Sequence, residues 1–416
     1  MFVPKLVYKY SNKTILKKCK VCKKLPDVRH ISFTNLLMCE SKKDDPQDSP
    51  LKKLLEESST FQNISPLSKE QQWATLPYTE DPNTAMSRKQ GDYFKNPGND
   101  PRDSSIILFP GQGTQYVGMA KELMKFPMAK DLFELANHIL GYDLLKVCLK
   151  GPQEKLDQTQ FAQPAIMVSS LAAIEQLKEE RPNAVANCVA TAGFSLGEIT
   201  ALVFAGSLGF ERALQLVNIR AEAMQLAAEA YKGGMLTIMI RPDSKLNYAC
   251  LKAKDWAVDK GDPIPECKIA NYLYPDCKVV SGSESALQYI EENYKIFNLR
   301  KVKRLPVSGA FHSKLMLPAM ETFQKSLEKT RIEDPAISVY SNVTGKKYKH
   351  GYDIRKNLPK QIVYPVKWEQ ILHAIYERDQ GAYFPRTFEI GPGSTLTTIL
   401  KQVNAKAYEQ AFNVRA

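Results

Sequence analysis

The stretch CVATAGFSLGE, Cys188–Glu198, decides the fold of this chain. Its first residues predict a short buried strand, and the Gly-x-Ser-x-Gly turn that follows leads into a helix rich in small residues. A serine on such a strand-to-helix turn, here Ser195, is a candidate nucleophile because the turn presents its hydroxyl at the edge of the sheet. Three fixed residues in five also occur by chance, so the pattern needs partners elsewhere in the chain.

Strands and helices alternate on both sides of this turn. The apolar run Ile106–Phe109 ends at Pro110-Gly111 and predicts a buried strand. Helical patterns follow over 121–149, 165–180 and 210–230, the last strands are expected at 338–342 and 387–390, and the final helix at 396–403. This order predicts an α/β fold with an α/β-hydrolase-like large domain, a mainly parallel sheet and helices on both faces.

A segment with a different order of predicted strands and helices interrupts the large domain. Short strands at 235–240, 267–271, 278–281 and 300–305 are separated by helical stretches at 244–258 and 283–294. The order strand, helix, strand, strand, helix, strand predicts an inserted ferredoxin-like subdomain at 233–305. The large domain would then occupy 104–232 and 306–412.

The N-terminal part of the chain predicts no globular structure. Residues 1–26 contain eight lysines and no acidic residue, which is typical of an organelle transit peptide, placed here at 1–43. A basic disordered tail is the alternative, and the lysine content does not separate a mitochondrial from a chloroplast peptide. Residues 44–103 are polar and lack periodicity, which predicts a linker or a loosely attached arm.

Composition excludes several classes of function. No apolar run in the 416 residues is long enough for a membrane span, and the net charge of +12 is not gathered into a nucleic-acid motif. The eight cysteines are scattered, which indicates thiols in a reducing compartment. Cys19-x-x-Cys22 is the one close pair, and a zinc site there would need Cys39 and His30 as well. We expect no metal.

A catalytic serine needs a base, and the chain has five histidines. His312 lies in a loop of small residues, Ser308–Ser313, between a predicted strand and a predicted helix, which suits a base held at the edge of a sheet. A structural loop histidine is the alternative. No acidic residue can be assigned to orient the imidazole, which weighs against an ordinary hydrolase triad and leaves a backbone carbonyl for that task.

A charged residue falls on the apolar stripe of the helix predicted at 210–230. Arg220 lies among Val217, Ala221 and Met224 at helical spacing. Its side chain could extend to water, or its guanidinium could lie in a pocket and bind a substrate carboxylate with two hydrogen bonds.

Two glycine-rich turns follow the first and last predicted strands, at 109–113 and 390–393. The first could present backbone N–H groups to a phosphate or an oxyanion. It lacks the Lys-Ser/Thr ending of a P-loop and the third glycine of a dinucleotide fingerprint, so nucleotide binding is not predicted. Either turn could also be purely structural.

Taken together and in order, these motifs closely resemble the malonyl-CoA:acyl carrier protein transacylase family, over about 106–403. They are Pro110-Gly111-Gln112-Gly113-Thr114-Gln115, Gly193-Phe194-Ser195-Leu196-Gly197-Glu198, Arg220, Gly309-Ala310-Phe311-His312-Ser313 and Glu389-Ile390-Gly391-Pro392-Gly393. With the transit-like leader, the resemblance is greatest to the mitochondrial member, which serves type II fatty acid synthesis in the matrix.

The resemblance implies a role for each motif residue. Ser195 would be the acylated nucleophile and His312 its general base, oriented by the main-chain carbonyl of Gln361, which precedes Pro365-Val366-Lys367-Trp368. The remaining roles would be an oxyanion hole from the backbone N–H groups of Gln112 and Leu196, and substrate contacts from Arg220, Phe311 and Met224. Many bacterial relatives have histidine where this chain has Phe194, so malonyl selectivity would rest on Arg220 and Phe311.

The implied reaction is ping-pong transfer of malonyl from coenzyme A to the phosphopantetheine thiol of acyl carrier protein, without a cofactor and by a monomer. A basic surface that includes Lys301, Lys303, Arg304 and Lys314 could steer the acidic carrier protein. Two alternatives stay open. A serine esterase or thioesterase would share the turn around Ser195, and a non-catalytic module would only bind the carrier protein.

Overall fold

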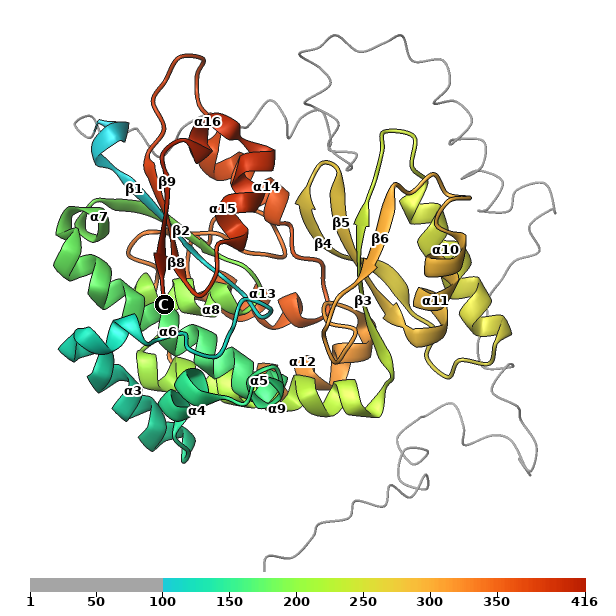
Figure 1. Ribbon diagram of the computed structural model, residues 1–416, viewed down its shortest axis with the longest axis horizontal. Coiled ribbons are helices and arrows are strands. Elements are labelled where there is room, and N and C mark those ends of the chain that lie inside the picture. The colour runs from blue at the N-terminus through green and yellow to red at the C-terminus, as the bar shows by residue number, and fades with distance from the viewer. Residues whose placement is uncertain (1–99) are drawn as a thin grey trace, which may run out of the picture. The chain divides into compact units, whose positions relative to one another are not determined.

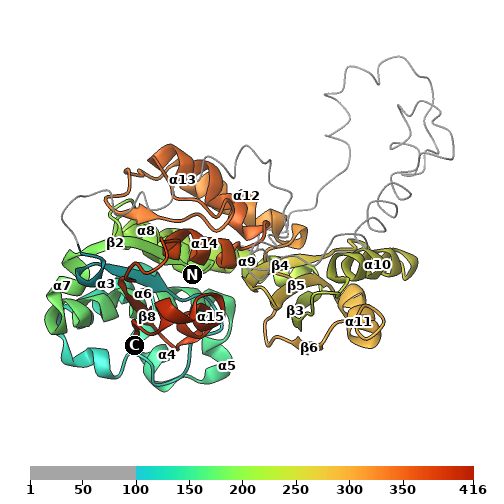
Figure 2. The same ribbon diagram turned by 90° about the horizontal axis from the view of Figure 1, so that it is seen from above.

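The structure is a computed structural model, and it describes residues 100–416 (Figures 1 and 2). The transit peptide predicted at 1–43 lies outside these residues, as does the predicted linker apart from its last four residues. Those residues include a 3-10 helix, Pro101–Asp103. Among residues 100–416, no helix has both the length and the apolar character that crossing a membrane requires.

The large sheet is parallel throughout, which confirms the predicted fold class. Its strand order is β7 (Ser338–Val339), β2 (Cys188–Gly193), β1 (Ser105–Phe109), β8 (Arg386–Gly391) and β9 (Ala411–Arg415). The prediction that 387–390 is the last strand was wrong, because β9 follows it and pairs with β8 at the edge of the sheet. Its side chains are half-buried or exposed, so it has no apolar run to mark it.

Strand β1 is buried on both faces, as parallel strands covered by helices are. Because successive side chains point to opposite faces, Ile107 and Phe109 belong to one apolar cluster while Ile106 and Leu108 belong to another. The first cluster includes α3 (Pro127–Leu140), α6 (Thr159–Glu180), α8 (Leu196–Phe204), α9 (Phe210–Ala230) and α12 (Leu317–Glu328). The second includes α14 (Trp368–Tyr376), α15 (Thr395–Val403) and α16 (Ala405–Tyr408).

The helical pattern at 121–149 forms separate pieces in the structure. A 3-10 turn at Glu122–Lys125 precedes α3, and Gly141 ends α3 in the left-handed conformation with a φ of 74°. The short helices of the large domain are α4 (Leu144–Lys150), α5 (Gln153–Leu156), α7 (Pro182–Ala186) and α13 (Gly351–Asn357).

The small sheet has the topology of a ferredoxin-like fold. Its antiparallel order is β4 (Cys267–Tyr274), β5 (Cys277–Ser283), β3 (Gly233–Met239) and β6 (Lys301–Arg304). Helices α10 (Leu246–Asp259) and α11 (Glu284–Asn293) connect β3 to β4 and β5 to β6, and both pack in a third apolar cluster against this sheet. In Figure 1 these elements form the yellow to orange group around β3.

The small sheet also holds a segment of the large domain in place. The backbone N–H of Tyr272 donates to Val366 at 2.9 Å, and the N–H of Val366 donates to Ala270 at 2.8 Å. A buried ion pair joins Lys278 of β5 to Glu369 of α14. Strands β4 and β5 therefore fix the chain just after residue 361, which matters for the site below.

Candidate active site

Ser195 stands on a strained turn between β2 and α8. Its φ of 51° lies in the left-handed region that residues other than glycine rarely adopt. A Cβ at Gly193 would lie 1.8 Å from Gly197, and a Cβ at Gly197 would lie 2.2 Å from the carbonyl oxygen of Phe109, so the turn has room only for glycines. Asn342 supports it by accepting from the Ser195 N–H at 2.7 Å and donating to the Gly193 carbonyl at 2.8 Å.

His312 is buried beside the backbone of Gln361. Its Nδ1 lies 2.5 Å from the Gln361 carbonyl oxygen. A carbonyl only accepts, so Nδ1 carries the proton and Nε2 is left with a lone pair. Burial lowers the pKa of His312 to about 4, which keeps the imidazole neutral at physiological pH. Among the described residues His312 has no hydrogen bond to Ser195 or to a carboxylate.

Arg220 lies on α9 and is almost fully buried, with 1% of its surface exposed. Its NH2 group donates to the Ser195 Oγ and to the Gln361 side-chain oxygen, both at 3.0 Å, and NH1 donates to Gln163 at 2.6 Å. Its Nε has no partner among the described residues. Burial lowers its pKa to about 10, so the guanidinium stays charged, and within residues 100–416 no carboxylate forms a salt bridge with it.

Arg220 also orients a chain of amides that ends near the first glycine-rich turn. A guanidinium only donates, so Gln163 turns its oxygen to Arg220 and its nitrogen to the Gln112 oxygen at 3.2 Å. The Gln112 nitrogen then donates to Thr159 at 3.1 Å. In the described chain, no hydrogen bond is donated by the backbone N–H groups of Gln112 and Leu196. Both groups are therefore free to stabilise an oxyanion.

The two remaining predicted residues are buried apolar side chains. Phe311 is 5% exposed and Met224 is 2% exposed. Met224 lies one helical turn after Arg220, and its sulfur is 3.6 Å from the nitrogen of Gln163. The structure thus brings together Ser195, Arg220, Gln361, His312, Gln163 and Met224 through direct contacts, whereas a substrate contact for Phe311 remains a prediction.

Three residues of the site were not predicted. Gln163 and Asn342 have no local sequence signal, because each acts on a residue distant in the chain. Glu198 was noted only as the neighbour of the turn, yet its carboxyl group contacts Tyr348 and Gln361 at 2.6 and 3.0 Å. An acidic residue in an otherwise apolar first helical turn was the signal that could have identified it.

No group of three or more ligands for a metal ion occurs within residues 100–416, and the zinc alternative at Cys19 and Cys22 lies outside them. The five described cysteines are buried free thiols, and burial raises the pKa of Cys148 and Cys188 to about 12. Neither thiol would be a nucleophile at neutral pH.

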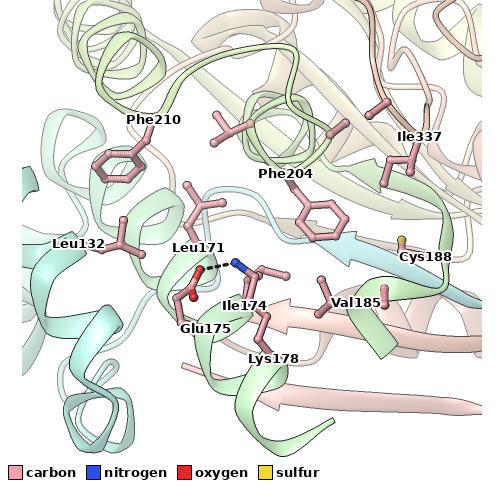
Figure 3. Close-up of a pocket in the computed structure, with 14 residues that line it drawn as sticks. Leu132, Leu171, Ile174, Glu175, Lys178, Val185, Cys188, Phe204, Phe210 and Ile337 are labelled. Carbon is pink, nitrogen blue, oxygen red and sulfur yellow. Dashed lines mark hydrogen bonds and ion pairs between the residues drawn. The ribbon is translucent and has the colours of Figure 1, made fainter. Parts of the chain in front are cut away.

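An apolar cavity of about 430 Å³ lies at the other end of β2 from Ser195 (Figure 3). It is lined by Leu171, Ile174, Phe204, Phe210 and the first strand residue, Cys188, with the ion pair Lys178–Glu175 beside them. Ser195 follows the last residue of the same strand, so this cavity is not the site of the serine chemistry.

Comparisons with known proteins find relatives of this chain. A family model described as an acyl transferase domain matches residues 106–411. A probable mitochondrial malonyl-CoA-acyl carrier protein transacylase from Drosophila melanogaster is 59% identical over 320 residues, which cover 77% of this chain and 84% of that protein. The mitochondrial malonyl-CoA-acyl carrier protein transacylase of Homo sapiens is 50% identical over 309 residues, covering 74% and 79%.

Solved structures are similar as well. The malonyl CoA-acyl carrier protein transacylase of Coxiella burnetii has a TM-score of 0.67 and 31% identity, and the match covers 76% of this chain and 95% of that one. A malonyl-transacylase solved in complex with a type II polyketide acyl-carrier protein has a TM-score of 0.66 and 30% identity, covering 75% and 96%.

Proposed function

The chain belongs to the malonyl-CoA-acyl carrier protein transacylase family, and we propose that it transfers malonyl groups from coenzyme A to acyl carrier protein through Ser195. The observation that carries this proposal is Arg220, a buried cation that contacts the Ser195 Oγ and forms no salt bridge with a carboxylate of residues 100–416, where Glu198 acts on it only electrostatically. A malonyl thioester supplies that carboxylate next to the carbonyl that Ser195 would attack. An acyl group without a carboxylate would leave the buried charge unpaired.

The first half-reaction acylates the serine. Malonyl-CoA brings its carboxylate to Arg220, and the Oγ of Ser195 passes from Arg220 to the Nε2 of His312. As Oγ attacks the thioester carbon, Nε2 takes the proton and the backbone N–H groups of Gln112 and Leu196 bind the oxyanion. The C–S bond then breaks, and the coenzyme A thiolate leaves with the proton from His312.

The second half-reaction runs the same steps in reverse with another thiol. The phosphopantetheine thiol of the carrier protein gives its proton to His312 and attacks the malonyl-serine ester, which restores the Ser195 hydroxyl. Because a thioester is exchanged for a thioester, the free energy changes little, and the main demand on the site is to exclude water. The burial of His312, Arg220 and Gln361 meets that demand.

The setting of the reaction follows from the relatives. The fly and human relatives are named mitochondrial, and residues 1–26 of this chain, which contain no acidic residue, have the composition of an organelle transit peptide, so the enzyme works in the mitochondrion, in type II fatty acid synthesis of the matrix. Each step above can be carried out by the side chains and backbone groups of one protomer, and we propose that the enzyme is a monomer that uses no cofactor.

The basic residues predicted to steer the carrier protein are not equally available for docking. Lys301 and Lys303 are exposed on β6, and Lys314 is exposed as well. Arg304 forms ion pairs with Glu284 and Glu291, so its charge is less available than the sequence suggested. We therefore assign steering of the acidic carrier to the three lysines, and turnover with the carrier protein should weaken as salt is added.

The test of function compares two products. The enzyme is mixed with malonyl-CoA and phosphopantetheinylated acyl carrier protein, and malonyl-carrier and free malonate are measured together. The proposal predicts that the malonyl-carrier forms much faster than malonate. Malonate release at a matching rate would support a thioesterase instead, and the absence of both products would support a non-catalytic binding module.

A further inference from the structure

One buried carboxyl group at the site has no part in the steps above. Glu198 is fully buried in the first turn of α8, three residues after the nucleophile. One carboxyl oxygen accepts from the Tyr348 hydroxyl at 2.6 Å and from the Asn342 N–H at 3.2 Å. The other accepts from the side-chain nitrogen of Gln361 at 3.0 Å. A buried carboxyl group is costly to maintain, so a specific role is expected.

The contact with Gln361 matters because of what Gln361 does at its other end. Its side-chain oxygen accepts from Arg220, and a guanidinium only donates, so the amide must point its oxygen at Arg220 and its nitrogen at Glu198. The main-chain carbonyl of the same residue binds His312. Gln361 thus contacts both the general base and the cation proposed to bind the malonyl carboxylate.

We propose that Glu198 is a positioning residue that sets malonyl selectivity by locking the side-chain amide of Gln361 against Arg220. The inference rests on the proposed function, because it assumes that Arg220 binds the substrate carboxylate. A free amide could rotate and turn its nitrogen toward the guanidinium, where two donors would repel each other. Glu198 prevents this rotation, so Arg220 keeps its place beside Ser195.

A carboxyl group suits this position and an amide does not. The N–H of Asn342 and the nitrogen of Gln361 both donate, one to each oxygen of Glu198. A glutamine there has one oxygen, so one of the two donors would always face its NH2 group. When the carboxyl group is protonated, its proton can lie against the Tyr348 hydroxyl, the one partner of the three that can also accept.

Glu198→Gln therefore changes the hydrogen-bond pattern with little change in shape. Burial raises the pKa of Glu198 to about 8, so at pH 7 the substitution also changes the charge little. We expect the ratio of kcat/KM for malonyl-CoA to that for acetyl-CoA to fall at least about tenfold, mostly through the KM for malonyl-CoA, because a mispaired buried donor is costly and tenfold corresponds to only about 1.4 kcal/mol. An effect on folding alone would lower kcat/KM by the same factor for malonyl-CoA and for acetyl-CoA, so their ratio would not change.

Tyr348→Phe is the matched control. It removes a partner of the same carboxyl group but leaves the bonds from Gln361 and Asn342, so it can lower the melting temperature while the malonyl-to-acetyl ratio stays within about twofold of the original. If Tyr348→Phe lowered the ratio as much as Glu198→Gln, the position of Gln361 would not be the cause and the inference would be overturned.

A double-mutant cycle keeps the inference testable if Glu198→Gln folds poorly. Gln361→Met removes the side-chain amide that links Glu198 to Arg220 and retains the main-chain carbonyl. It should therefore lower the malonyl-to-acetyl ratio by itself, and adding Glu198→Gln should lower that ratio no further. The inference would be overturned if the fold-changes of the two single variants multiplied in the double variant. It would also be overturned if neither single variant changed the malonyl-to-acetyl ratio. Loss of malonyl transfer by the unsubstituted enzyme would instead overturn the proposed function.

Discussion

The guanidinium of Arg220 donates a 3.0 Å hydrogen bond to the Oγ of Ser195, although Ser195 lies on the turn before α8 and Arg220 lies on α9, 25 positions later. The group proposed to bind the substrate therefore already contacts the proposed nucleophile. A hydrogen bond from a cation lowers the nucleophilicity of a hydroxyl, so on the proposed mechanism Ser195 would become active when the substrate carboxylate takes over the guanidinium. Selection of the substrate and activation of the serine are then one event.

Removal of the cation should change selectivity more than folding. Arg220→Ala is expected to lower kcat/KM for malonyl-CoA by about 100-fold or more, because the substrate carboxylate would be buried without a partner. Acetyl-CoA, which has no free carboxylate, should be used as well as before or better. Steady-state kinetics with both substrates tests this, with Arg212→Ala, an exposed change on the same helix, as control. An unchanged malonyl preference would refute the assignment.

The pH profile should report a buried histidine. With the pKa of His312 near 4 rather than 6.5, the base is neutral down to mildly acidic pH, so the acid limb of kcat/KM should lie well below pH 6. A limb near pH 6.5 would mean that water reaches the imidazole.

The same shift affects stability. A histidine whose pKa is lower in the folded state binds fewer protons there, so its contribution is present above pH 6.5 and is lost as the pH falls toward 4. Over that window the loss is about 3 kcal/mol in the free energy of unfolding. Glu198, whose pKa burial raises to about 8, contributes a slope of opposite sign above about pH 4.5, so the His312 contribution is measured as the difference between the wild type and His312→Gln in urea denaturation.

The strained turn at Ser195 should depend on Asn342. Asn342→Ala removes both the acceptor for the Ser195 N–H and the donor to the Gly193 carbonyl. We expect a loss of about 2 kcal/mol in the free energy of unfolding and a fall in kcat that exceeds any change in KM. Urea denaturation and single-turnover acylation measure the two effects. Full acylation rate in a folded variant would show that the turn keeps its shape without this side chain.

The buried ion pair between the small sheet and α14 should behave asymmetrically. Glu369→Gln alone should lower the free energy of unfolding by about 3 kcal/mol, since it leaves the 5%-exposed Lys278 without its anion. The double variant Lys278→Met/Glu369→Met should recover most of that loss. If the double variant is as unstable as the single one, the pair acts through something other than charge burial.

Much of the fold could be predicted from local patterns. Helix α9 has the bounds that its apolar periodicity predicts, and β1, β2 and the strands β3, β4 and β5 of the small sheet lie where short apolar runs end in turns. Strand β9 could not be found this way, since it is an edge strand with mostly exposed side chains and depends on pairing with β8.

The site was predictable only where a residue type is unusual in its surroundings. Arg220 on an apolar stripe and the glycines beside Ser195 are such cases. Asn342, Gln163 and Tyr348 are ordinary polar residues whose partners lie 147, 57 and 150 positions away, so only the folded chain reveals them. The main-chain carbonyl of Gln361 has no side-chain pattern of its own, and its contact with His312 was predicted from the family resemblance alone.

The central claim is that Ser195 carries the malonyl group, and mass spectrometry of the enzyme after brief mixing with malonyl-CoA tests it most directly. We predict one malonyl adduct on the peptide that contains Ser195, its disappearance when holo acyl carrier protein is added, and no adduct in Ser195→Ala. An adduct on another residue, or a folded wild-type enzyme that turns over malonyl-CoA without any adduct, would contradict the account.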